Sequence, residues 1–189
     1  MTQISIIKKN YKIIYTGAIR RINNLGIILD VAKEIKDKSI KFIIFGDGDE
    51  LPILKERILK ENINNVIFKG KVNKQYIPSI ISKANLNLVH WEMNPLLIVG
   101  ESYNKAFEYY AAGKPILYTI TPNYSIAKKY DAGRLPSGYS KTDLANDIIA
   151  MKNMSDAEKE KMSRNAGNVA QIYDFKNLTN SLIDIIEKI

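Results

Sequence analysis

The stretch KIIYTGAIRRINNLGIILDVAKEIK, residues 12–36, contains the pattern that decides the fold. Residues 12–16 are rich in β-branched and aromatic side chains, which is typical of a strand, and residues 25–36 repeat apolar side chains at helical spacing. The turn between them, residues 17–24, begins with Gly17 and carries Arg20 and Arg21. The stretch therefore predicts a strand, a glycine turn and an amphipathic helix.

The same unit recurs along the 189-residue chain. Further strands are predicted at residues 41–45, 65–68, 86–90 and 115–119, with an edge strand at 132–136. Helices are predicted at residues 51–62, 74–84, 104–112 and 125–130, and three more at 141–152, 156–173 and 178–189. This alternation predicts an α/β fold in a single domain, residues 1–189, with a doubly wound, Rossmann-like parallel sheet. We expect about six strands in the order 3-2-1-4-5-6, followed by C-terminal helices.

This strand order predicts where a ligand binds. In such sheets, ligands lie beyond the carboxyl ends of the strands where the order reverses, here between the first and fourth strands. The turn at 17–24 and the loop at 91–104 both lie there. We therefore expect Arg20 or Arg21, the amide groups near Asn104, and the side chains of Lys105 and Glu108 to converge on one cleft.

The short helix at 104–112 contains an electrostatic conflict. Lys105 lies in its first turn, where a cation opposes the helix dipole by about 0.3–1 kcal/mol. An anion bound by both the helix N-terminus and the lysine would resolve the conflict. The alternative is a solvated pair of Lys105 with Glu108. The spacing also predicts an apolar face of Phe107, Tyr110 and Ala111.

The cleft chemistry favours a nucleoside diphosphate. Two arginines, a lysine and a helix N-terminus can hold a diphosphate, and Gly17 lets the backbone approach a phosphate closely. Glu108 would repel phosphate, but its carboxylate can accept two hydrogen bonds from a ribose diol.

Other ligand classes fit less well. NAD would require G-x-G-x-x-G after the first strand, where only Gly17 is present, and the GDG at 46–48 follows the second strand. No P-loop motif occurs. The chain has no cysteine and one histidine, His90, so we expect no metal and no resident cofactor, and His90 is interpreted as a strand-end residue.

The net charge of +8 favours anionic partners, but the lysines are scattered, so no nucleic-acid partner is expected. No apolar run approaches the ~20 residues that span a bilayer, and the N-terminus lacks the order of a signal peptide. We expect a soluble, cytoplasmic protein whose positive charge is compatible with peripheral contact at the inner face of the cell membrane.

Four segments, in order, carry a family resemblance: YTGAIRRINNLGIILDVAKEI, FIIFGDGDELPILKE, NVIFKGKVNKQYIPSIISKANLNLV and SYNKAFEYYAAGKPIL. Together they resemble the donor-binding half of GT-B glycosyltransferases, in particular the retaining family 4. Members of the similar subgroup often build capsular or O-antigen polysaccharides. The resemblance covers nearly the whole chain and implies a nucleotide-sugar donor.

The resemblance also implies roles for residues around the short helix. Glu108 matches the second acid of the family's E-x7-E motif, which binds the ribose. The first acid, which helps to hold the donor sugar, would fall at Gly100, and the neighbouring Glu101 is one position off. The amides that hold the diphosphate fall at Asn104 and Lys105.

Elsewhere the chain departs from the family pattern. The family's arginine often follows the glycine directly, whereas Ala18 follows Gly17 here. Arg20 is the best substitute and Arg21 the second, and Arg20 and Lys105 are the residues expected to stabilise the departing diphosphate. The base should lie against the backbone of residues 70–72, which are Gly70, Lys71 and Val72.

A complete enzyme of this fold has about twice this length. The resemblance thus implies an N-terminal acceptor-binding domain, in cis or in trans, without which the chain binds donor but transfers little sugar. Two alternatives stay open: a noncatalytic nucleotide-binding or partner-assembly module, and a sugar-nucleotide 2-epimerase of the same fold. The last helix, 178–189, has an apolar face. The helix either crosses back to the other domain, covers an otherwise open apolar patch, or packs onto the sheet.

Overall fold

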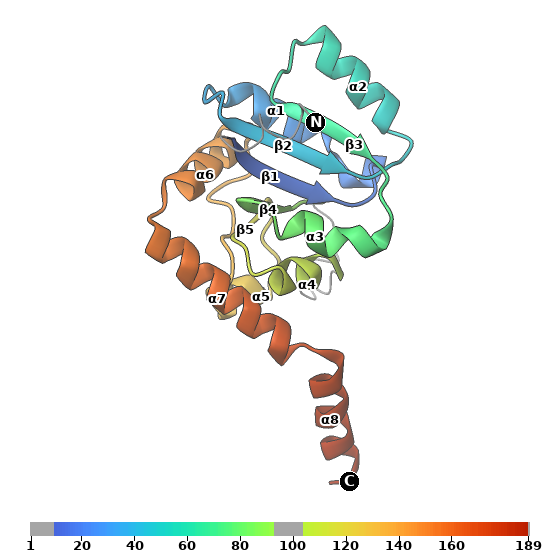
Figure 1. Cartoon of the computed structure of the whole chain (residues 1–189), viewed down its shortest axis with the longest axis vertical. Helices are drawn as coiled ribbons and strands as arrows, with labels where there is room; N and C mark the ends of the chain where they lie inside the picture. The colour runs from blue at the N-terminus through green and yellow to red at the C-terminus, as the bar shows by residue number, and fades with distance from the viewer. Residues whose placement is uncertain (1–9, 93–103, 189) are drawn as a thin grey trace.

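The computed structural model describes residues 10–92 and 104–188. Five parallel strands form one sheet in the order β3-β2-β1-β4-β5 (Figure 1). The strands are β1 (Tyr11–Thr16), β2 (Ile40–Phe45), β3 (Val66–Gly70), β4 (Leu86–Val89) and β5 (Ile116–Tyr118). The predicted α/β class is confirmed, and so is the order of the first five strands.

The predicted sixth strand, at residues 132–136, is reduced to a single bridge. Arg134 forms an isolated parallel bridge with Leu117, and its N–H donates to the Ile116 carbonyl at 2.8 Å. The ladder cannot extend beyond Leu135, because Pro136 has no N–H to donate. Arg134 therefore lies beside β5 at the sixth position of the sheet, but residues 132–136 do not form the strand that we expected.

The helices follow the predicted segments closely. They are α1 (Gly26–Glu34), α2 (Leu51–Lys60), α3 (Ile77–Ile81), α4 (Asn104–Ala111), α5 (Ile126–Lys129), α6 (Lys141–Asn153), α7 (Asp156–Ile172) and α8 (Phe175–Ile186). Two short 3-10 helices are η2 (Arg21–Asn23) and η3 (Lys74–Tyr76). The predicted helix at 74–84 is thus divided into η3 and the much shorter α3, which has Pro78 in its first turn.

The core lies on both faces of the sheet, as expected for parallel strands. Along β1, Ile13 and Tyr15 face a cluster that contains residues of α1 and α6. Ile14, between them, faces a second cluster that contains residues of α4 and α7. The contacts between α4 and α7 fix α4 in place on that second face, at the carboxyl ends of the strands.

The last helix, α8, leaves the body of the molecule beyond α7 (Figure 1). It has no buried residue, so it does not pack onto the sheet. Its large apolar side chains are exposed; Phe175 is 86% exposed, and the others are Leu178, Leu182, Ile183, Ile185 and Ile186. Among the described residues, no helix has the length and apolar character needed to cross a membrane.

Candidate functional site

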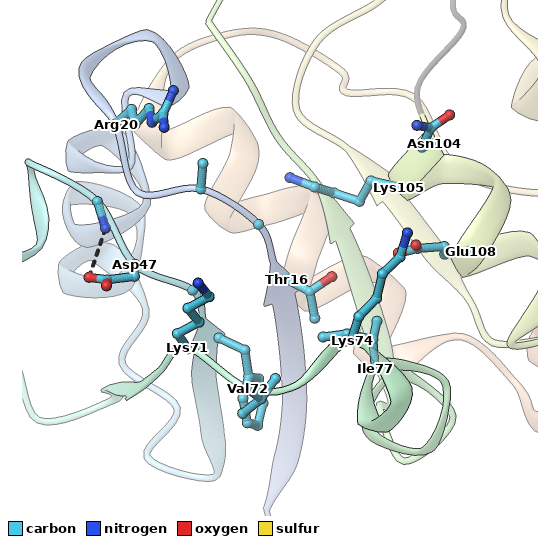
Figure 2. A pocket seen from close by; sticks show the side chains of 15 residues that line it. Thr16, Arg20, Asp47, Lys71, Val72, Lys74, Ile77, Asn104, Lys105 and Glu108 are labelled. Atoms are coloured by element: carbon cyan, nitrogen blue, oxygen red, sulfur yellow. Dashed lines mark hydrogen bonds between the residues drawn. The ribbon is translucent and has the colours of Figure 1, made fainter.

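A hollow of about 580 Å³ opens at the carboxyl ends of the strands, where the strand order reverses (Figure 2). The loops after β1, β2 and β3 form one side of it, and α4 forms the other. Its lining consists of Thr16, Gly17, Ala18, Arg20, Phe45, Gly46, Asp47, Gly48, Lys71, Val72, Lys74, Ile77, Asn104, Lys105 and Glu108.

The loops after β1 and β2 continue to pair beyond the ends of their strands. The N–H of Gly17 donates to the Phe45 carbonyl at 2.9 Å, and the N–H of Ile19 donates to the Asp47 carbonyl at 2.9 Å. These bonds extend the sheet register into the turn. The first part of the glycine turn is therefore a fixed wall of the hollow.

Two glycines in the loop after β2 allow this close pairing. A Cβ on Gly46 would lie 1.8 Å from the Gly17 carbonyl oxygen, and a Cβ on Gly48 would lie 2.2 Å from the Ile19 carbonyl oxygen. The N–H of Gly46 also donates to the Gly70 carbonyl at 2.9 Å, which joins the end of β3 to the same wall. The GDG turn thus has a packing role that the sequence did not disclose.

Lys105, in the first turn of α4, lies against the glycine turn. Its Nζ is 3.9 Å from the centre of the Tyr15 ring, and a Cβ on Gly17 would lie only 2.5 Å from that Nζ. Burial lowers the pKa of Lys105 from 10.5 to about 8, while the charge of Glu108 acts in the opposite direction. Among the described residues, no carboxylate forms an ion pair or hydrogen bond with this ammonium group. The solvated Lys105–Glu108 pair is therefore not observed.

The buried face of α4 differs by one position from the one that we predicted. Ala106, Tyr109 and Tyr110 are buried, whereas Phe107 is half-buried and Ala111 is exposed. The prediction failed because α4 contacts both the sheet and α7, and spacing alone does not say which side chains face each. The observed rotation leaves the two ionic side chains of the helix, Lys105 and Glu108, facing the hollow.

Three further cations surround the hollow, all of them exposed. Lys71 and Lys74 rise from the segment after β3, and Arg20 lies at the rim on the loop after β1, away from them (Figure 2). Asp47 is the acidic residue on that side, and its Oδ1 accepts a hydrogen bond from the Gly48 N–H at 2.9 Å. The hollow therefore carries an excess of positive charge.

The structure brings most of the predicted site residues together. Seven of them line the hollow: Gly17, Arg20, Lys71, Val72, Asn104, Lys105 and Glu108. Arg21 does not line it, because it begins η2 and its exposed side chain belongs to the next turn of the loop. Gly70 ends β3 beside the hollow without lining it. Gly100 and Glu101 lie outside the described residues.

Several lining residues escaped sequence reasoning, among them Thr16, Phe45, Lys74 and Ile77. Thr16 and Phe45 are the last residues of β1 and β2, and the parallel register pairs them directly. That register could have identified both as floor residues, since two neighbouring strands end at the same edge. Lys74 and Ile77 had no comparable signal, because they depend on how the predicted helix at 74–84 is divided.

His90 follows β4 and holds two loops together from a buried position. Its Nε2 lies 3.1 Å from the Asn24 carbonyl oxygen, so Nε2 carries the hydrogen and donates; its Nδ1 then accepts from the Thr119 hydroxyl at 2.7 Å. Burial lowers the pKa of His90 to about 4, and the charge of Lys105 acts in the same direction. His90 is therefore neutral at pH 7 and has the structural role expected of a strand-end residue.

Within residues 10–92 and 104–188, no cluster of three or more His, Cys, Asp or Glu side chains could hold a metal ion. The residues that line the hollow can instead bind an anion next to a hydroxyl-bearing group.

Comparison with known proteins identifies the family and shows where the fold recurs. The family model described as "Glycosyl transferases group 1" matches residues 1–169. No curated protein matches the sequence. Among solved structures, Anabaena Alr3699/HepE in complex with UDP superposes with a TM-score of 0.79 at 18% identity, over 99% of this chain and 51% of that chain.

Two further structures have the same fold. The catalytic domain of cholesterol-α-glucosyltransferase from Helicobacter pylori matches with a TM-score of 0.67 at 18% identity, over 86% of this chain and 98% of that one. WaaG, a glycosyltransferase involved in lipopolysaccharide biosynthesis, matches with a TM-score of 0.71 at 15% identity, over 97% of this chain and 49% of that one. The chain spans about half the length of HepE.

Proposed function

The chain belongs to the group 1 glycosyl transferases, and on this premise we propose that it is the donor-binding half of a GT-B glycosyltransferase. Its hollow binds a nucleoside-diphosphate sugar, which is a substrate rather than a resident cofactor. Together with an acceptor-binding domain, supplied in cis or in trans, it transfers the sugar to a glycan or a lipid-linked acceptor.

The observation that carries this proposal is the state of Lys105. A partly desolvated ammonium group without an anionic partner among the described residues is unfavourable, and its place in the first turn of α4 adds repulsion from the helix dipole. A diphosphate bound against Gly17 would remove both penalties. It would accept hydrogen bonds from Lys105 and from the first amides of α4, near Asn104.

Glu108 supports the nucleoside part of the proposal. It lines the same hollow one turn beyond Lys105, where a carboxylate would oppose phosphate but could accept hydrogen bonds from the ribose hydroxyls. From there the base would extend toward the segment after β3. Lys71 and Val72 line the hollow at that end, and the backbone of Gly70 adjoins them.

The proposed transfer step breaks the bond between the anomeric carbon and the diphosphate oxygen and forms a bond to the acceptor oxygen. Negative charge grows on the departing diphosphate, which can accept the proton that the acceptor hydroxyl releases. Lys105, with Arg20 at the rim, would stabilise that charge electrostatically. Retention at the anomeric carbon is part of the proposal and follows from the resemblance to family 4.

The proposed biological role is synthesis of a surface polysaccharide, of capsular or O-antigen type. The fold shared with WaaG, which is described as acting in lipopolysaccharide biosynthesis, is compatible with that role. The net charge of +8 would favour an acidic membrane face that presents a lipid-linked acceptor.

A thermal-shift panel tests the donor site. The protein is melted with UDP, GDP, ADP or NAD at one common concentration; a ligand present at about a hundred times its dissociation constant adds about 2.7 kcal/mol. We expect one nucleoside diphosphate to raise Tm in the wild type and not in Glu108→Ala. Equal shifts in both proteins, or no shift with any nucleoside diphosphate, would contradict the proposed site.

A further inference from the structure

Two adjacent tyrosines on α4 are both fully buried, yet their hydroxyl groups bond in different directions. The Tyr109 hydroxyl accepts a hydrogen bond from the Thr16 N–H at 2.9 Å and lies 3.1 Å from the Thr16 Oγ1. The Tyr110 hydroxyl lies 2.7 Å from the hydroxyl of Tyr118 on β5. One side chain therefore ties α4 to the end of β1, and the other ties it to β5.

The hydrogen bond between Tyr109 and Thr16 connects the two walls of the hollow, α4 and the end of β1. Thr16 is the last residue of β1 and immediately precedes Gly17, whose backbone approaches the Lys105 ammonium. On α4, Glu108 immediately precedes Tyr109, and Lys105 lies one turn earlier on the same helix. The Tyr109–Thr16 link thus joins the helix that carries the two ionic side chains to the strand end that leads into the glycine turn.

We propose that Tyr109 is a positioning residue of the donor site, which sets the spacing between α4 and the glycine turn through its hydroxyl group. The proposal rests on the proposed function for its link to donor binding. Tyr109 would not touch the donor, because it is fully buried and does not line the hollow. It acts through Lys105 and Glu108.

The strength of the effect follows from the bonds that would be lost. Tyr109→Phe leaves the buried N–H of Thr16 without its acceptor, and an unsatisfied buried donor favours a shift that exposes it to water. The Lys105 ammonium is held between the Tyr15 ring and Gly17, and even a small misplacement of a positioned group can weaken its function strongly. We expect Tyr109→Phe to weaken UDP binding about tenfold, the equivalent of about 1.4 kcal/mol.

Tyr110→Phe is the matched control, because it removes one hydroxyl from an equally buried tyrosine on the same helix. Isothermal titration with UDP is measured for the wild type and both variants, alongside Tm. The proposal predicts that both variants lose similar Tm, that Tyr109→Phe loses about tenfold in UDP affinity, and that Tyr110→Phe loses less than about twofold. Equal losses of affinity in the two variants would overturn it.

A second readout needs no nucleotide. The titration of Lys105 is followed by NMR through its side-chain carbon next to the amine, with Lys105→Arg used for assignment. In Tyr109→Phe the ammonium leaves its desolvated place, so its pKa rises from about 8 toward 10.5, whereas Tyr110→Phe leaves it unchanged. If the wild type bound no nucleoside diphosphate, the proposed function would fail, and this titration alone would decide the positioning role. An unchanged Lys105 pKa in Tyr109→Phe would overturn that role.

Discussion

Lys105→Met is expected to raise the stability of the folded protein while it weakens donor binding. In the ligand-free molecule the ammonium is partly desolvated and has no anionic partner among the described residues. Methionine has a similar length without the charge, so it can occupy the same space over the Tyr15 ring. The substitution therefore removes an unfavourable charge and leaves most of the packing.

The size of the effect can be worked out from the burial of the lysine. A fall in the Lys105 pKa from 10.5 to about 8 corresponds to about 3 kcal/mol of destabilisation of the charged form. The lost interaction with the Tyr15 ring offsets about 1–2 kcal/mol of the gain. The net gain of about 1–2 kcal/mol would raise Tm by about 2–8 °C in a domain of this size.

The pH dependence gives the prediction a characteristic sign. The folded pKa of about 8 lies below the unfolded value, so the penalty is full below pH 8. It disappears as pH rises from about 8 to 10.5, because the folded protein then releases the proton that the unfolded chain still holds. The stability difference between variant and wild type is therefore largest near pH 7 and small near pH 10.

The assay is chemical denaturation at pH 7, 8.5 and 10, with UDP titration at pH 7. Removing a charged hydrogen bond to the diphosphate should weaken UDP binding about 10- to 100-fold. Lys83→Met, an exposed lysine outside the hollow, is the control and should change neither property. A Lys105→Met protein that is less stable than wild type at pH 7, or that binds UDP equally well, would refute the reasoning.

Three further predictions concern other parts of the molecule. Glu108→Gln should weaken the binding of UDP more than the binding of 2′-deoxy-UDP, both measured by titration, because the carboxylate is expected to accept hydrogen bonds from the ribose hydroxyls. Equal losses of affinity for both ligands would be inconsistent with that role. The pKa of His90 is lowered to about 4, so wild-type stability should fall as pH drops from about 6.5 to 4, and denaturation of His90→Gln should show a flatter profile. Ending the chain after residue 173 removes α8, which has no buried residue, so Tm and UDP affinity should stay near wild type while light scattering shows less self-association.

The fold was predictable from the sequence because its signals are local and repeated. Apolar runs of strand length alternate with helical spacing, and the glycine turn after β1 marks the first crossover. The sixth strand was not predictable in the same way. Its apolar pattern resembles a strand, but Gly133 and Pro136 limit the backbone pairing that it can make.

The candidate site was predictable in outline because strand order places the carboxyl ends of β1 and β4 side by side. The details of the site that depend on tertiary packing were not predictable from the sequence. The close contact of Lys105 with Gly17, the interlocking of the GDG turn with the first loop and the phase of α4 all arise from contacts between distant segments. No spacing rule on one helix shows that Tyr109 reaches Thr16, which lies 93 positions earlier.

The most direct test of the donor site is an NMR titration of the ¹⁵N-labelled protein with UDP, observing backbone amides. Saturable shifts are expected at Gly17 and Lys105 and around Glu108, with the amides of residues 62–65, at the opposite ends of the strands, unchanged. Saturable shifts that avoid the hollow, or the same shifts in Lys105→Met with undiminished affinity, would contradict a diphosphate site built on α4 and the glycine turn.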